Sequence, residues 1–273
     1  MKKKSISYWM ICIFLILALV ITLLPIYLML ATSTKSTFQF ATNFWGVAIP
    51  PKWDNYKIAW DAIGKYMANT IWVAILQVIG TLVISVLAGY AFAKMKFKGR
   101  TALFMLIMAF RMIPGTLTMI PNFLNTYKFG LYNTHMGVVL PVLAGLSFMP
   151  LLMTKSFFEG IPDDIFEAFR IDGANEFNII TKLVLPLSKP IVATSALFTF
   201  FGTFGQYVWP LLILADDKKK MIATGLMSFS GAYGTDYGVQ MAAYSIVSVL
   251  LMVIVSLTMK TYVEGITAGA VKG

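Results

Sequence analysis

The chain has 273 residues, of which 58% are hydrophobic and 12% are charged, and its mean hydropathy is +0.77 with a net charge of +10. This composition excludes a water-soluble globular domain and indicates an integral membrane protein embedded in a lipid bilayer. Because the bases gather beside hydrophobic runs, the positive charge indicates membrane topology, and no nucleic-acid partner is expected.

Six apolar runs approach the length of about twenty residues that a helix needs to cross the roughly 30 Å hydrocarbon core of a bilayer. The first follows three lysines as a signal peptide would, but it is too long and lacks a small-x-small cleavage site, so we expect it to be retained. The sequence therefore predicts an all-α membrane protein with six transmembrane helices. They lie at about 9–31, 67–93, 101–120, 136–154, 191–214 and 241–259.

Lysine and arginine side chains indicate the orientation of these spans. Four of them crowd the short loop at 94–100 between the second and third runs, and three precede the first run. Bases beside short loops stay on the cytoplasmic side, so we expect a multi-pass cell-membrane protein with both termini and the stretch 155–190 in the cytoplasm. The lysines at 218–220 would then lie outside, against this rule, although two aspartates adjoin them.

A loop of about 35 residues follows the first run on the expected outer side and is rich in aromatic residues. Such residues commonly anchor a chain at the membrane interface, and a docking surface for an extracellular partner is the alternative. We divide the chain into an N-terminal transmembrane helix with its extracellular loop, at 1–66, and a larger transmembrane domain, at 67–273. The aromatic residues of the loop include Phe38, Phe40, Trp45, Trp53, Tyr56 and Trp60.

The stretch 155–190 is the one long, heavily charged segment between the central apolar runs. Each charge would cost about 2.5 to 3.5 kcal/mol at the bilayer centre, so the stretch must lie in water. Its acids are Glu159, Asp163, Asp164, Glu167, Asp172 and Glu176, and its bases are Lys155, Arg170, Lys182 and Lys189.

Local signals predict a short helix over about 162–172 in this stretch. Pro162 suits the first helical position, the next two aspartates suit the positive end of the helix dipole, and Gly173 can adopt the left-handed conformation that ends a helix. A second helix is expected to begin at the cap residue Asn175 and to run to Val184, where Pro186 and Pro190 break it.

The first of these helices gathers Ile165, Phe166 and Phe169 on one side. An apolar face on a helix in water must be covered. Packing on the ends of the chain's own membrane helices would cover it, and so would a groove in a separate protein.

A signature within the two helices resembles the EAA loop of ABC importer permeases. Phe169 stands where that family usually has a second alanine, and Leu183 stands where it favours isoleucine. The residues that carry the resemblance are Glu167, Ala168, Asp172, Gly173, Ala174, Leu183, Leu185 and Pro186.

Four further segments are similar to the smaller permease subunit of maltose-type carbohydrate importers. These segments are 111–123, 130–141, 231–238 and 262–273. The resemblance implies that 67–273 has the architecture of a type I ABC importer permease with cytoplasmic coupling helices. It also implies a permease subunit of an ATP-driven, binding-protein-dependent importer for a carbohydrate, expected to be an oligosaccharide. Glycerol phosphate or a polyol is the alternative cargo.

The resemblance further implies the partners of the chain: a second homologous permease, two ATP-binding subunits and an extracellular substrate-binding protein. The loop would lodge in a cleft of an ATP-binding subunit, with Glu167 facing an arginine there and with Ala168 and Gly173 allowing close approach. The chain contains no G-x-x-x-x-G-K-[ST] motif, so ATP and Mg²⁺ belong to the partners, and the chain itself is expected to be no enzyme and to hold no cofactor. The full set of expected coupling residues is Glu167, Ala168, Phe169, Asp172, Gly173, Ala174, Leu185 and Pro186.

A few polar and aromatic residues within the spans are candidates for a substrate pathway. Arg111 is the one strong base inside a span, ahead of Pro114 and Gly115, which would break the helix; it either faces a cavity or reaches the interface. Amides and ring faces suit a sugar, although a tryptophan near a span end also anchors at the interface. The family commonly has Trp-Asn-Asp or Trp-Asn-Glu where this chain has Phe-Gly-Gln at 204–206. The pathway candidates are Arg111, Asn122, Gln206, Tyr207 and Trp209, with Asn125 as a weaker one.

The remaining features of the sequence concern other classes of protein and the C-terminal segment. His135 is the only histidine and cannot complete a metal or catalytic site alone, so none is predicted. A secondary carrier would need acids within the spans, which are essentially absent, and a non-transporting scaffold would share the hydropathy. The C-terminal segment would fray, or in this family would reach the ATP-binding subunits through Thr267, Ala268, Gly269 and Lys272.

Overall fold

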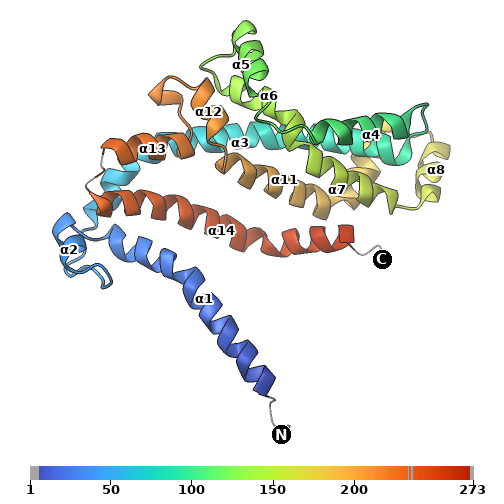
Figure 1. Cartoon of the computed structure of the whole chain (residues 1–273). Coiled ribbons are helices and arrows are strands. Elements are labelled where there is room, and N and C mark those ends of the chain that lie inside the picture. Colours follow the sequence, from blue (N-terminus) through green and yellow to red (C-terminus); the bar gives the residue numbers. More distant parts are fainter. Residues whose placement is uncertain (1–5, 233, 235, 271–273) are drawn as a thin grey trace. The chain divides into compact units, whose positions relative to one another are not determined.

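The computed structural model describes the backbone of residues 6–232, 234 and 236–270, and within these it describes the side chains of all residues except 6, 7, 230 and 261–270. The described chain is helical and contains no strand, which confirms the all-α prediction (Figure 1). Its first half contains α1 (Ile6–Ser33), α2 (Thr37–Thr42), α3 (Asp54–Lys94), α4 (Arg100–Arg111), α5 (Met119–Lys128), α6 (His135–Leu146) and α7 (Phe148–Glu159). Its second half contains α8 (Asp163–Ile171), α9 (Glu176–Ile179), the π-helix η1 (Ile180–Val184), α10 (Leu185–Leu187), α11 (Lys189–Phe204), α12 (Val208–Ile213), the 3₁₀-helix η2 (Asp217–Lys219), α13 (Ile222–Ala232) and α14 (Tyr237–Ala270).

Three helices of the described chain are long and apolar enough to cross a membrane, at Tyr8–Ser33, Asp54–Lys94 and Tyr237–Lys260. Two bent pairs raise this number to five if each pair is one span: α6 with α7, bent by 44°, and Glu176–Leu187 with α11, bent by 83°. A bent pair lets a polar or functional segment interrupt the helix within one crossing.

The third predicted span, 101–120, does not form a single helix. α4 ends at Arg111 and α5 begins at Met119, with turns between them. Pro114 lies in this break, where its ring and its missing N–H prevent the helix from continuing. The predicted span 191–214 is divided in the same way, because α11 ends at Phe204 before Gly205 and α12 is a separate short helix.

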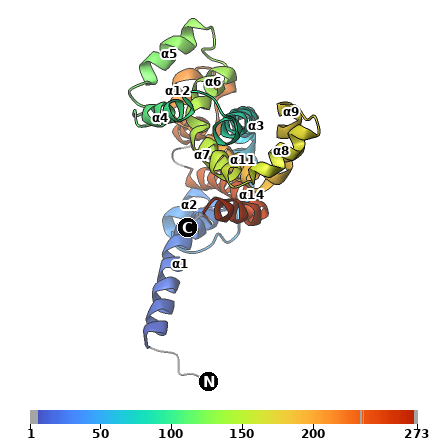
Figure 2. The same cartoon turned by 90° about the vertical axis from the view of Figure 1, so that its right-hand side faces the viewer.

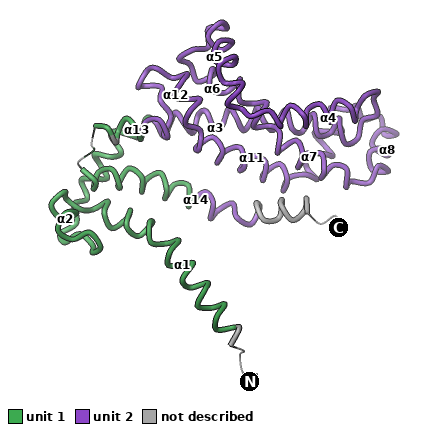
Figure 3. The backbone as a smooth tube through the Cα atoms, viewed as in Figure 1, with its two compact units in different colours: residues 1–65, 226–253 green, residues 66–225, 254–273 purple. Residues whose placement is uncertain are grey.

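The described chain forms two compact units, 1–65 with 226–253 and 66–225 with 254–273 (Figure 3). The boundary between residues 65 and 66 lies one residue from the predicted division. The first unit also includes 226–253, which the predicted division assigns to the larger domain.

The first unit is organised around the loop that follows α1. Lys35 is fully buried, and its ammonium donates hydrogen bonds to the backbone carbonyls of Asn43 and Phe44, both at 2.7 Å. Burial lowers the pKa of this lysine. Asn55 ties the same turn to the start of α3, because its amide donates to the carbonyls of Ser33 and Lys35. Of the predicted interface anchors, Phe38, Trp45, Trp53 and Trp60 remain exposed in the described chain.

The second unit contains the charged stretch and the candidate pathway residues. Its helices α3 and α7 approach each other closely. Thr154 Oγ1 donates to the carbonyl of Ser85 at 2.8 Å, and a Cβ atom at Gly89 would collide with Thr154. One apolar core, which includes Tyr90, Phe158 and Phe166, lies under the charged stretch. A second core, which includes Val138 and Ile213, lies where α6 and α12 meet.

Candidate functional site

The first helix of the charged stretch forms close to its predicted limits. α8 covers Asp163–Ile171, and Pro162 lies at its N-cap, one residue before the first helical position that the sequence predicts for it. Gly173 has φ +79° and ends the helix in the left-handed conformation. The backbone N–H of Gly173 donates to Arg170 and that of Ala174 donates to Phe169, which is the hydrogen-bond pair of a Schellman motif.

The second helix runs further than predicted. Asn175 caps it as expected, because its side-chain oxygen accepts from the N–H of Asn178 at 2.8 Å. The chain does not stop at Val184: it passes through the π-helix η1 into α10 and turns by 83° only between Leu187 and Lys189. Pro186 lies in the first turn of α10, where no α-helical hydrogen bond from its nitrogen is required.

The C-terminal end of α3 holds α8 in place through Lys94. Its ammonium donates to the carbonyl of Ile161 at 2.6 Å and to Asp163 Oδ1 at 2.5 Å, and it lies 4.9 Å from the centre of the Phe166 ring. The hydrogen bond and the charge of Lys94 lower the pKa of the Asp163 carboxyl. The Lys94 side chain is only 6% exposed, so this contact is shielded on the lysine side.

Tyr90 connects α3 to the second helix of the stretch. Its hydroxyl donates to Glu176 Oε2, and Arg170 Nη2 lies 3.4 Å from both the tyrosine hydroxyl and Glu176 Oε1. Tyr90 is 1% exposed. Figures 1 and 2 both place α8 beside the end of α3, where Lys94 contacts Asp163. Tyr90 and Lys94, one helical turn apart, therefore attach both short helices to one membrane helix.

The apolar face of α8 is covered by the chain itself only in part. Phe166 is 1% exposed and packs in the core with Val86 and Phe158, and Phe169 packs against the same core. The packing alternative therefore holds for these two phenylalanines. Ile171 and Phe177 are 86% and 73% exposed, although sequence reasoning assigned neither a role. The stretch thus buries part of its apolar surface in its own chain and leaves the side chains of Ile171 and Phe177 open.

The expected coupling residues fall into two groups. Phe169, Ala174 and Leu185 are half-buried against the core of their own chain. The other five are exposed: Glu167, Ala168, Asp172, Gly173 and Pro186.

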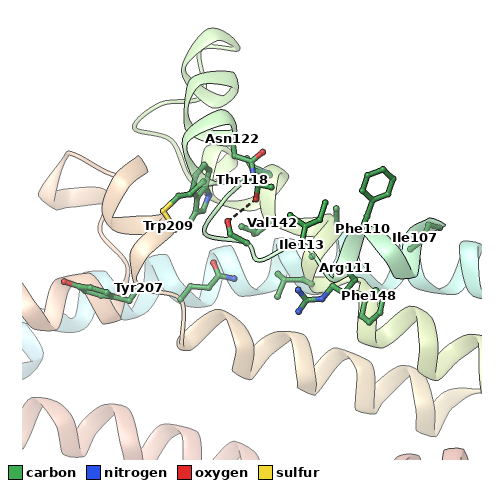
Figure 4. A pocket seen from close by; sticks show the side chains of 17 residues that line it. Ile107, Phe110, Arg111, Ile113, Thr118, Asn122, Val142, Phe148, Tyr207 and Trp209 are labelled. Carbon is green, nitrogen blue, oxygen red and sulfur yellow. Dashed lines mark hydrogen bonds between the residues drawn. The ribbon is translucent and has the colours of Figure 1, made fainter. Parts of the chain in front are cut away.

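All five candidate pathway residues line one cavity of about 700 Å³ in the second unit (Figure 4). The breaks in the helices create it, because Arg111 and Asn122 flank the break between α4 and α5 while the other three residues lie in or after the break that follows α11. Asn125 does not line this cavity. The cavity residues taken from the sequence are Arg111, Asn122, Gln206, Tyr207 and Trp209.

The cavity wall combines aromatic rings, amides and a single cation. The Arg111 guanidinium lies 5.5 Å from the centre of the Phe148 ring, and Figure 4 shows the two side chains next to each other. Trp209 Nε1 donates to the carbonyl of Gly137 at 3.2 Å, so its ring is held in place. The lining residues include no aspartate or glutamate. Such a wall can stack against apolar ring faces and hydrogen-bond hydroxyl groups.

Two further features of the sequence remain, His135 and the C-terminal segment. His135 Nε2 lies 3.0 Å from the carbonyl of Lys219, which is a structural contact between the start of α6 and η2. Thr267, Ala268 and Gly269 belong to the last turns of α14, but their side chains, and the whole of Lys272, lie outside the described residues. Their contact with ATP-binding subunits stays a prediction.

Comparison with known proteins covers both regions. Residues 81–266 match the family model described as binding-protein-dependent transport system inner membrane component. The chain is 32% identical to the diacetylchitobiose uptake system permease protein NgcG of Streptomyces coelicolor, over 87% of this chain and 81% of that protein. It is 34% identical to the trehalose/maltose transport system permease protein MalG of Thermococcus litoralis, over 76% of this chain and 75% of that protein.

Two further matches extend over nearly the whole chain. The arabinooligosaccharides transport system permease protein AraQ of Halalkalibacterium halodurans is 27% identical over the full length of both proteins. A chain in the crystal structure of a bacterial ABC transporter involved in the import of the acidic polysaccharide alginate superposes with a TM-score of 0.81, at 24% identity over 96% of this chain and 99% of that one. This likeness confirms the predicted fold class.

Proposed function

The chain belongs to the family of binding-protein-dependent transport system inner membrane components, and from that premise we propose that it is a permease subunit of an ATP-driven importer for an oligosaccharide. Relatives whose names refer to arabinooligosaccharides, diacetylchitobiose and trehalose or maltose support a carbohydrate as the cargo. The observation that carries the proposal is the single cavity that unites all five pathway candidates inside the matched region.

The cavity suits a sugar better than an ion or an apolar solute. A saccharide ring has apolar faces that stack on aromatic side chains, and its rim of hydroxyl groups both donates and accepts hydrogen bonds. Trp209 and Phe148 supply rings, and Gln206 and Asn122 supply amides. A cavity of about 700 Å³ is in the usual range for a small-molecule site.

The exposed side of the charged stretch is the docking surface for a cytoplasmic ATP-binding subunit. Ile171 and Phe177 offer open apolar side chains of the kind that a helix places in a partner's groove, and Glu167 is exposed with no ion pair among the described residues. In this proposal the stretch and both termini lie in the cytoplasm, as the bases beside the short loops indicate. As a permease subunit the chain is not itself an enzyme, so ATP and Mg²⁺ are bound by two partner subunits.

Movement passes from the ATP-binding subunits to the membrane helices through α3. Because Lys94 and Tyr90 attach the charged stretch to α3, a displacement of the stretch displaces that helix as well. ATP drives this change only through its different affinity for the two states of the assembly. A second, homologous permease completes the pathway, and an extracellular substrate-binding protein delivers the sugar.

Reconstitution tests the proposal. The chain is purified from its native membrane with its partners, placed in proteoliposomes with ATP, and supplied with labelled arabinotriose, diacetylchitobiose, maltose or glycerol 3-phosphate. We expect a second permease and an ATP-binding subunit to co-purify, and one of the saccharides to accumulate only with ATP and the binding protein.

Each alternative predicts a different result in the same experiment. Uptake by the chain alone indicates a secondary carrier, and accumulation of glycerol 3-phosphate alone indicates the alternative cargo. Purification without any ATP-binding subunit indicates a scaffold and overturns the proposal.

A further inference from the structure

Gln77 is a fully buried amide in the middle of α3, immediately behind the wall of the cavity. It does not line the cavity itself, but its hydrogen bonds lead there. Gln206 Nε2 donates to Gln77 Oε1 at 2.9 Å, and Gln77 Nε2 donates in return to Gln206 Oε1 at 3.3 Å. The two amides therefore face each other, one buried and one on the cavity wall.

Two further groups contact the buried amide, and one of them, a backbone carbonyl, can only accept. The Thr203 hydroxyl lies 2.7 Å from Gln77 Oε1, and Gln77 Nε2 lies 3.5 Å from the carbonyl of Val138. Thr203 belongs to α11 and Val138 to α6, so Gln77 is held from two helices besides its own. A buried amide without such partners would destabilise the fold.

The pairing leaves a defined part of Gln206 available to a ligand. A side-chain amide has two N–H donors and a carbonyl oxygen with two lone pairs. Gln77 occupies one N–H and one lone pair of Gln206. One N–H and one lone pair remain, directed to opposite sides of the amide of a half-buried side chain that lines the cavity. The free N–H can donate to one saccharide hydroxyl group and the free lone pair can accept from another, because hydroxyl groups both donate and accept.

Orientation matters more for an amide than for a carboxylate. The two oxygens of a carboxylate are equivalent acceptors, whereas rotation of an amide by half a turn exchanges its donor and its acceptor. A glutamine on the cavity wall therefore recognises a hydroxyl pattern only if a second group fixes its orientation. Gln77 is placed to do this, because its Nε2 faces the carbonyl of Val138, which can only accept, and this leaves its Oε1 facing the Nε2 of Gln206.

We propose that Gln77 is a positioning residue for substrate recognition, which holds the Gln206 amide so that one N–H and one carbonyl lone pair are presented to hydroxyl groups of a saccharide in the cavity. This inference rests on the proposed function. It identifies polyhydroxylated ligands as the class that the cavity distinguishes from compounds of similar shape without hydroxyl groups.

The test is a double-mutant cycle on the purified, complete transporter. The dissociation constant of the tritiated saccharide that the wild type accumulates, chosen from maltose, diacetylchitobiose and arabinotriose, is measured for Gln77→Leu, Gln206→Leu and the double variant. We expect each single variant to weaken binding about tenfold and the double variant to be no weaker than Gln206→Leu.

Thr81→Val is the matched control. Thr81 is one turn away on α3, is fully buried and has a hydroxyl with no hydrogen-bond partner among the described residues, so its replacement should leave sugar affinity unchanged. A structural role for Gln77 predicts a lower unfolding temperature with unaltered affinity, or losses that add in the double variant, and either result overturns the inference.

The two proposals fail differently in this experiment. If the wild type transports a saccharide and Gln77→Leu binds it normally, the positioning role is wrong while the importer stands. If the wild type accumulates none of the saccharides, both proposals are overturned.

Discussion

The charged stretch and the cavity, both in the second unit, are held together by different kinds of interaction. The stretch is attached to α3 by an ion pair between Lys94 and Asp163 and by the contacts of Tyr90 and Arg170 with Glu176. The cavity wall is held by neutral groups, the Gln77–Gln206 amide pair and the indole of Trp209. The difference follows from the surroundings, because an ionised group is tolerated in water and costs several kcal/mol within hydrocarbon.

Arg111 is the exception within the cavity. It is the one charged residue among the lining residues, and it lies against the Phe148 ring. A cation over an aromatic face retains favourable electrostatics without an acid. Under the proposed function the two regions have separate tasks: the stretch transmits force and is recognised by a protein, while the cavity exchanges a hydroxylated ligand with water.

The largest effect is expected at Gly173. Replacement by leucine forces a side chain into a left-handed turn at φ +79° and places it on the exposed coupling surface, although no atom of the described chain lies within 4 Å of the new Cβ. We expect uptake to fall at least about 100-fold while the protein still inserts, because the obstacle lies toward the partner. Uptake and membrane content are measured together.

Gly99→Leu is the control for this prediction. Gly99 has φ +81° and equally open surroundings, but it lies in the loop between α3 and α4. Both variants have the same backbone strain, so only the Gly173 variant should abolish uptake. Equal uptake by the two would contradict a special role for the coupling surface.

The next largest effect is expected at Lys94. Lys94→Met removes the ion pair to Asp163 and leaves the carbonyl of Ile161 without its donor. Hydrogen bonds to charged groups contribute about 1.5 to 3 kcal/mol each, so we expect the stretch to loosen and uptake to fall about tenfold while the ATP-binding subunit still co-purifies. Lys98→Met, at an exposed lysine without an ion pair in the described chain, should transport normally. Loss of the ATP-binding subunit from Lys94→Met would contradict a role limited to transmission.

A smaller effect is expected from charge reversal at Glu167. Its side chain is exposed, so Glu167→Lys should leave the unfolding temperature of the chain unchanged and weaken attachment of the ATP-binding subunit about fivefold, which corresponds to about 1 kcal/mol. Attachment of the ATP-binding subunit to Glu167→Gln should be intermediate between that of the wild type and that of Glu167→Lys. Attachment is measured as the ratio of subunits after purification, and unaltered ratios for both variants would exclude an electrostatic contact here.

The smallest effect is a pH dependence at Asp163. Lys94 lowers the pKa of this carboxyl, so the folded state favours the ionised form, and the resulting stability is present above the pKa of about 3.9 of an unfolded aspartate and is lost as the pH falls through the lower folded value. Asp163→Asn should therefore have a slightly lower unfolding temperature than the wild type at pH 7 and at pH 5. The difference should shrink below about pH 4. A difference that grows on acidification would have the wrong sign.

The sequence predicts those parts of the fold that depend on neighbouring residues. Gly173 and Asn175 specify a helix end and a helix start through their own backbone and side chain, and both act as expected. Pro114 breaks the third apolar run as its chemistry requires, yet hydropathy alone counts this run as a span. Hydropathy measures how favourably a segment partitions into lipid. The break at Pro114 depends instead on which backbone hydrogen bonds the segment can form.

The long-range pairs could not be predicted in this way. Tyr90 with Glu176 and Gln77 with Gln206 join residues far apart in the sequence, and no local pattern specifies such partners. Lys94 was identified only as a marker of topology. The sequence indicates the individual cavity residues, because a charge or an amide within a span is costly unless its surroundings are polar. That these residues line one cavity follows from the tertiary fold.

The most direct test of the central claim is photo-crosslinking from the two faces of the charged stretch in the assembled transporter. A benzophenone amino acid replaces either Phe177, which is 73% exposed, or Phe166, which is 1% exposed. We predict that the probe at 177 crosslinks to an ATP-binding subunit and that the probe at 166 crosslinks only within the chain. Crosslinks from 177 that never reach an ATP-binding subunit would contradict the assignment of this face as the surface through which the importer is driven.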